Sequence, residues 1–194
     1  GVLLDPSPTS PFVPRTLVET YFNKLSPSES QRAQHALQEK MIQWSEEQQA
    51  EQMKTIIHKI TLDQGNIDYV TKGEVKGTLL NQFSLDEYQD HLRVATTATF
   101  YLDRGQKMYN IVSVLDEDLD VVGTLENIAP EERIYAARFM GERLYLVTFK
   151  QVDPFFVIDL SDEKKPKILG ALKIPGFSQY LHPYDDNHIL GIGQ

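Results

Sequence analysis

The sequence predicts a mainly β protein with a helical segment in front of it. From Thr55 to the end, short runs of β-branched and aromatic residues alternate with turn-forming clusters, which is typical of antiparallel strands. Before Thr55 the apolar residues recur at helical spacing. A chain of 194 residues with 41% hydrophobic residues is long enough for one large or two small domains with a buried core.

Composition and charge exclude several functional classes. A net charge of -9 and a pI near 5.0 argue against nucleic acid as a partner, because phosphate binding needs clustered Lys and Arg. The absence of cysteine excludes a disulfide framework and a thiolate metal site. No apolar run approaches the roughly 20 residues of a spanning helix, so we expect no membrane span in this chain. Because the chain begins at Gly1 rather than Met and shows no signal-peptide pattern, we expect a processed fragment.

The sequence of residues 1–54 predicts an extended N-terminal segment, the lead-in, followed by a helical hairpin. Proline-rich Gly1–Pro14 is the lead-in, and Arg15–Leu25 has the spacing of a short amphipathic helix. Ser26-Pro27-Ser28-Glu29 then places Ser at a helix cap, Pro at the first helical position and Glu three residues after the cap. A long helix is predicted from there to about Lys54. We expect this hairpin to pack on the β domain, residues 55–194.

The stretch Glu142–Gly176 predicts most of one antiparallel unit. Leu144–Phe149 and Phe155–Ile158 are nearly continuous apolar runs, which favours strands buried on both faces. Ile168–Ile174 alternates more, which favours a strand nearer the surface. Asp153-Pro154 and Ser161-Asp162 separate the runs with residues that do not easily continue a strand.

An internal repeat extends this unit along the chain. Apolar strands end in Asp63, Asp116 and Asp159, which lie 53 and 43 residues apart. This spacing matches four-stranded propeller blades of about 40–50 residues each. The sequence therefore predicts a partial β-propeller of about three blades. A closed ring needs typically four to eight blades, so we expect the open edges to be covered by missing blades or by self-association.

The blades divide into predicted strands as follows. Thr55–Leu62 and Asn66–Glu74 are the outer two strands of a first blade, and Phe177–Leu181 and His188–Gly193 begin a fourth. The predicted strands of the second blade are Leu79–Phe83, Leu92–Thr99, Met108–Leu115 and Leu119–Leu125. Ile134–Met140 joins the three runs of Glu142–Gly176 in the third.

Three segments carry a family resemblance: Lys76–Thr97, Glu132–Asp162 and Leu169–Gly193. They resemble bacterial and archaeal secreted proteins with a C-terminal β-propeller distantly related to WD repeats, and the resemblance runs from about Thr55 to the end. It implies an extracellular or cell-surface location, an unknown biochemical role and no catalytic residues. Members are longer than this chain, so the resemblance also implies blades beyond both ends and a helical hairpin inserted between blade strands.

Asp116, Asp118 and Asp120 form the first of two candidate metal sites. They match the opening of a calcium-binding loop, but the sixth position is Val121 instead of Gly and the twelfth is Asn127 instead of Glu. The other copies also have polar turns here. A hairpin turn is therefore the favoured interpretation, and a cation site the alternative.

The second candidate is the cluster of His182, Asp185, Asp186 and His188. His and carboxylate together suit a transition metal, but the spacing matches no established site and Pro183–Asn187 favours a turn. Ser178 lacks the second glycine of a nucleophile elbow. No phosphate-binding glycine loop occurs, so we expect no cofactor.

Two functional classes remain. The first is a non-catalytic exported or cell-surface scaffold whose propeller binds protein or a surface polymer. The alternative is an extracellular hydrolase or lyase whose site lies in the central channel, where side chains from several blades converge without a local motif. Convergence of His182, Asp185 and His188 with other titratable groups in one pocket would favour the enzyme.

Overall fold

The computed structural model describes residues 20–102, 105–149, 153–174, 176, 178–185 and 187–193. The chain divides into two compact units, Gly1–Ser45 and Glu46–Gln194, which we describe separately. The packing of the helical segment on the β domain stays a prediction. In the part of the chain that the structure describes, no helix is long and apolar enough to cross a membrane.

The helical segment consists of a short helical stretch, Thr20–Phe22, and the long helix α2, Pro27–Gln52. The predicted cap is confirmed, because the Glu29 carboxylate accepts from the Ser26 backbone N–H at 2.9 Å. These bonds with Ser26, the hydroxyl bond first, lower the pKa of Glu29. The earlier part of the predicted short helix lies outside the described residues.

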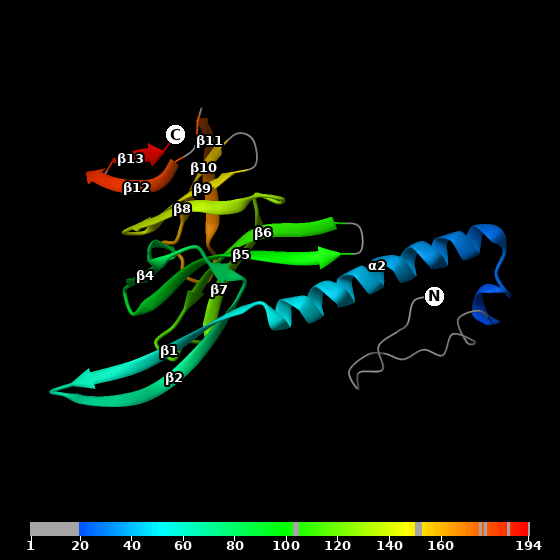
Figure 1. Cartoon of the computed structure of the whole chain (residues 1–194), viewed down its shortest axis with the longest axis horizontal. Coiled ribbons are helices and arrows are strands. Elements are labelled where there is room, and N and C mark those ends of the chain that lie inside the picture. Colours follow the sequence, from blue (N-terminus) through cyan, green and yellow to red (C-terminus); the bar gives the residue numbers. More distant parts are fainter. Residues whose placement is uncertain are drawn as a thin grey trace. The chain divides into compact units, whose positions relative to one another are not determined.

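The described residues of the second unit form four antiparallel sheets after the end of helix α2 (Figure 1), and we call them blades 1 to 4 in chain order. Blade 3 is a four-stranded meander. Its strands are β8 (Arg133–Met140), β9 (Arg143–Phe149), β10 (Asp153–Asp159) and β11 (Lys167–Ile174). Leu144, Leu146 and Val147 are buried, whereas the described side chains of β11 are exposed. The prediction that Leu144–Phe149 is buried and Ile168–Ile174 lies nearer the surface is confirmed, whereas Phe155–Val157 are half-buried rather than buried.

Blade 2 follows the same order with a divided first strand. Its strands are β3 (Thr78–Leu79), β4 (Leu85–Tyr88), β5 (His91–Leu102), β6 (Gly105–Leu115) and β7 (Val121–Ile128). The predicted strand Leu79–Phe83 is wrong beyond Leu79. A 3-10 helix, η1 (Gln82–Ser84), forms there because the Asn81 side chain accepts from the Phe83 N–H at 2.9 Å.

Blades 1 and 4 are two-stranded in the residues that the structure describes. Blade 1 pairs β1 (Lys54–Asp63) with β2 (Asn66–Lys76), and blade 4 pairs β12 (Ser178–Asp185) with β13 (His188–Gly193). Phe177, predicted to begin β12, lies outside the described residues. The mainly β architecture with antiparallel blades is confirmed.

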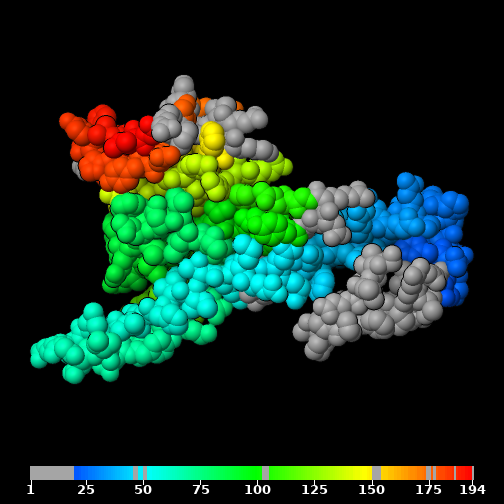
Figure 2. All heavy atoms as spheres, viewed as in Figure 1, coloured from blue at the N-terminus to red at the C-terminus, as the bar shows by residue number. Residues whose placement is uncertain are grey.

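A glycine in the last strand of blades 1, 2 and 3, which corresponds to the fourth strand of blade 3, marks the structural repeat. Gly73 pairs with Ile57, Gly123 with Val114 and Gly170 with Val157. Asp116 and Asp159 lie two residues after their paired positions, but Asp63 lies six after Ile57. Aligning blade 1 with the other blades through Asp63, as the sequence repeat suggested, is therefore out of register by four residues. The β1–β2 hairpin is longer than its counterparts. Figure 2 shows this hairpin leaving the rest of the second unit as a narrow arm.

Apolar clusters fill the junctions between consecutive blades. The largest joins blades 2 and 3 and includes Val112, Ile134, Leu146 and Ile158. A second joins blades 1 and 2 around Val75 and Leu115, and a third joins blades 3 and 4 around Val147 and Leu181. Apolar burial between the sheets therefore holds the blades together.

Buried polar groups also link blades 2 and 3. Arg93, 3% exposed, forms an ion pair with Asp86 and donates to the Gly141 carbonyl of blade 3 at 2.6 Å. Asn110 is fully buried and donates to the carbonyls of Ile128 and Glu132, both at 3.1 Å. Arg93 thus reaches the β8–β9 turn of blade 3, and Asn110 holds the segment that connects β7 to β8, so these bonds help to fix how the two sheets meet.

Candidate functional site

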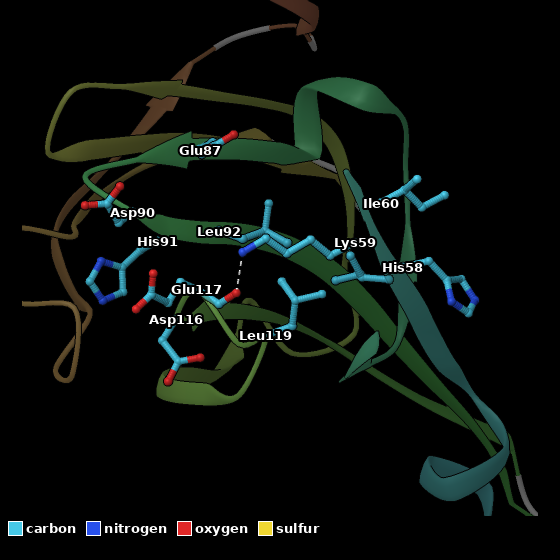
Figure 3. A pocket seen from close by; sticks show the side chains of 11 residues that line it. His58, Lys59, Ile60, Glu87, Asp90, His91, Leu92, Asp116, Glu117 and Leu119 are labelled. Atoms are coloured by element: carbon cyan, nitrogen blue, oxygen red, sulfur yellow. Dashed lines mark hydrogen bonds between the residues drawn. The ribbon is translucent and has the colours of Figure 1, made fainter. Parts of the chain in front are cut away.

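One groove of the second unit lies between β1 and two turns of blade 2 (Figure 3), with a volume of 390 Å³. The Lys59 side chain enters it and donates to the Glu117 carbonyl at 2.5 Å, while His58 points away. Glu87, Asp90 and His91 line the opposite side. The groove is acidic and surrounds one lysine.

The repeat relates this groove to the next junction between blades. At the next junction, Arg93 of the second strand, β5, donates to Gly141 in the turn between β8 and β9. The equivalent turn of blade 2, at Gln89 and Asp90, borders the groove. In the described residues β1 pairs only with β2. In a four-stranded blade the second strand would lie beside β1, at this groove, so the groove is a weak candidate for a ligand site.

The aspartates of the predicted calcium loop form a turn. Asp116 accepts from the backbone N–H groups of Asp118 at 3.1 Å and Asp120 at 2.9 Å. Asp159 accepts in the same way from Ser161 at 3.0 Å. Both carboxylates stabilise the turn after a third strand, and the cation site stays a prediction.

The histidines near the end of the chain lie in two separate pairs. His188 Nδ1 lies 2.7 Å from an Asp185 carboxylate oxygen at the end of the β12–β13 hairpin. His182 Nδ1 lies 3.1 Å from the Tyr180 hydroxyl. Asp186 lies outside the described residues. Among the residues that the structure describes, no three His or acidic side chains are grouped to hold a metal.

The first strands of blades 2, 3 and 4 bring a different set of side chains together. Phe83 comes from η1, Arg138 from β8, and Tyr180 and Pro183 from β12, which packs beside β8. The Phe83 and Tyr180 rings lie 5.5 Å apart. In a closed propeller the first strand of each blade would lie nearest the central channel, so this cluster would border that channel. Phe83, Arg138 and Pro183 also line a hollow of 270 Å³.

Arg138 is the charged group of this cluster. Its guanidinium carbon lies 4.8 Å from the centroid of the Phe83 ring and 5.9 Å from that of Tyr180. In contrast to Arg93, Arg138 forms no ion pair with another described residue. Asp86, the carboxylate that lines the hollow, is engaged by Arg93. The two aromatic rings therefore contact the guanidinium by cation–π interaction, and no described carboxylate is paired with it.

Sequence reasoning missed this cluster. Its members come from three blades and share no local motif. The signal that the sequence does contain is weak: Phe83, Arg138 and Tyr180 each lie in the first segment of a predicted blade, whereas Pro183 falls in a predicted turn. Of the residues that it singled out near the end of the chain, Asp185 and His188 are in contact, whereas His182 contacts Tyr180 instead.

Comparison with known proteins gives the family. The model of the beta propeller domain family matches residues 14–194. The chain belongs to the beta propeller domain family. The match begins before the helical segment, so the family pattern of this propeller domain includes helix α2.

Two archaeal proteins are similar to this propeller domain. An uncharacterized protein of Methanocaldococcus jannaschii is 46% identical over 177 residues, covering 91% of this chain and 28% of the relative. An uncharacterized protein of Archaeoglobus fulgidus is 50% identical over 141 residues, covering 73% of this chain and 21% of the relative. The chain spans less than a third of the length of either relative.

Proposed function

We propose that this propeller domain is part of an exported or cell-surface binding scaffold, and that its channel wall binds an acidic group of a protein or surface polymer. The observation that carries the proposal is Arg138, held against two aromatic rings beside a hollow. A guanidinium in this setting binds a carboxylate through two parallel hydrogen bonds, and the rings provide apolar contact for the rest of the ligand.

Binding is favoured over catalysis by the chemistry of the cluster. Hydrolysis or lyase chemistry needs a positioned base or a pair of carboxylates. Asp86 is held by the buried Arg93, and the His182 ring contacts the Tyr180 hydroxyl. Arg138 cannot accept a proton at physiological pH. These groups recognise charge and shape, and the alternative of a channel hydrolase or lyase has no specific observation in its favour.

A panel of peptides and glycans, each in a neutral and a carboxylate-bearing form, tests the binding proposal. We expect the protein to retain carboxylate-bearing probes and to lose them in Arg138→Gln, with an unchanged melting temperature. Arg143→Gln, an exposed arginine of β9, is the matched control and keeps binding. Equal retention of neutral and acidic probes, or binding unaffected by Arg138→Gln, would reject the proposed site.

The location needs a separate experiment because it rests on the family resemblance. Fractionation of cells that express the full-length protein, with surface proteolysis of intact cells, is the direct measurement. We expect the propeller to be cleaved from outside. Protection in intact cells together with cleavage after lysis would place the scaffold inside and would contradict the proposed export.

We further propose that additional blades cover the open faces of this domain. The pairs Ile60 with Tyr69 and Leu62 with Ile67 place four exposed apolar side chains on one face of the β1–β2 hairpin. Ile57 and Lys59 alternate with Ile60 and point to the other face, toward blade 2. The relatives have the length for further blades. In a ring, the apolar face would meet the preceding blade.

A further inference from the structure

We infer that the surface of β11 around Gly170 is a socket for the turn between the third and fourth strands of blade 4. This socket is independent of the proposed binding at Arg138. The occupant is a segment of the same polypeptide that follows β13, so the inference assigns both the surface and its partner. It rests on a contact that the structure shows at the two preceding junctions.

At each of those junctions a fourth-strand glycine receives the turn of the next blade. A Cβ atom at Gly73 would lie 2.7 Å from the Leu119 Cβ, and one at Gly123 would lie closer than 3.0 Å to the Glu163 carbonyl oxygen. Real Cβ atoms essentially never approach other atoms so closely. Glycine is therefore required at both positions by the close approach of backbone.

Gly170 occupies the same position in blade 3, but its surroundings are open. No atom lies within 4 Å of a Cβ placed there. The residue two positions later shows the same contrast. Val75 is 3% exposed and Leu125 packs against the core between blades 2 and 3, whereas the equivalent Leu172 is 61% exposed. β11 thus carries both the glycine and the apolar residue of a junction.

Blade 4 stands on the correct side to supply the missing contact. Its first strand, β12, packs beside β8 of blade 3, and β13 pairs with β12. A third and fourth strand would continue this sheet outward, as β10 and β11 do in blade 3. The relatives extend far beyond the matched region. A second copy of the chain is the competing occupant, and the experiment separates the two.

Thiol labelling tests the socket directly, because the chain has no cysteine of its own. Leu172→Cys is compared in the 194-residue chain and in the full-length polypeptide that contains it. We expect labelling by a maleimide to be at least tenfold slower in the full-length polypeptide. Ala171→Cys is the matched control, because the equivalent Glu74 and Thr124 are exposed, and it should label equally fast in both.

Glycine substitution gives an independent measurement. Gly123→Ala should lower the melting temperature by roughly 2–12 °C in either polypeptide, since overpacking is destabilising. Gly170→Ala should leave it unchanged or slightly raised in the 194-residue chain, because glycine weakens a strand. In the full-length polypeptide the same substitution should act like Gly123→Ala.

Two results would overturn the inference. Equal labelling of Leu172→Cys in both polypeptides would show that nothing covers β11. Protection already present in the 194-residue chain would assign the surface to another occupant, and dependence of that protection on protein concentration would identify a second copy.

Discussion

The junction between blades 2 and 3 and the open face of blade 3 are built from the same repeat but differ in burial. At the junction, Gly123 lies close against the backbone of Glu163, and Leu125 packs against the apolar core between the blades. On the open face, Gly170 and Leu172 have the same spacing, but no atom lies within 4 Å of a Cβ placed at Gly170 and the Leu172 side chain is exposed. The difference shows that the blade sequence specifies a contact surface whether or not its partner is present.

The largest expected effect is a difference in stability between variants of two leucines, one at the junction and one on the open face. Leu146→Ala removes a fully buried side chain from the core between blades 2 and 3. It should lower the free energy of unfolding by about 2–5 kcal/mol, measured by urea denaturation. Leu172→Ala, on the open face, should change it by less than about 0.5 kcal/mol. A similar loss for both leucines would show that the open face is already packed.

The second prediction concerns the buried ion pair at the junction. Arg93→Met removes the guanidinium that binds Asp86 and the Gly141 carbonyl. We expect a loss of about 3 kcal/mol in unfolding free energy, near the low end for breaking a buried pair, because the Asp86 side chain keeps 31% of its surface exposed. Arg143→Met is the control. Equal stability of the two variants would show that Arg93 does not stabilise the junction.

The third prediction tests the neutral polar group at the same junction. Asn110→Ala leaves the Thr97 hydroxyl and the carbonyls of Ile128 and Glu132 without their side-chain partner. The expected loss is about 1–3 kcal/mol, read from chemical denaturation. Gln106→Ala, on the exposed part of the same strand, should stay within about 0.5 kcal/mol of the parent. A neutral Asn110→Ala would mean that water replaces the amide.

The smallest effect is expected at the turn that leads into the open face. The Ser161 N–H, the Ser161 hydroxyl and then Lys167 lower the pKa of Asp159. A lowered folded pKa contributes stability above the unfolded value of about 3.9, and this stability is lost as pH falls through the folded pKa.

Asp159→Asn should therefore flatten the loss of stability between about pH 5 and 2, and should cost less than about 1 kcal/mol at pH 7. Thermal unfolding across that range is the measurement, with Asp68→Asn on exposed β2 as the control. An acid transition as steep as that of the parent would contradict the role of Asp159.

Most of the strand positions could be predicted because they depend on local pattern. Strand β9 begins one residue before the predicted run Leu144–Phe149 and ends at the same residue. Strand β11 likewise begins one residue before the predicted run Ile168–Ile174. The capping box at Ser26 fixed the start of α2 for the same reason. The failure at Leu79–Phe83 has a local cause too, since Asn81 bends the chain into η1 by accepting from the Phe83 N–H.

The sequence by itself determined the antiparallel blades and their order, since turn residues and apolar alternation act over a few neighbours. Only the tertiary structure showed that Gly73 and Gly123 mark the repeat better than Asp63 does, and that Arg138 lies against aromatic rings of two other blades. The physical reason is distance along the chain. A glycine is required by the backbone of the next blade, and an arginine is placed by rings from two other blades, so neither constraint is visible within one segment of sequence.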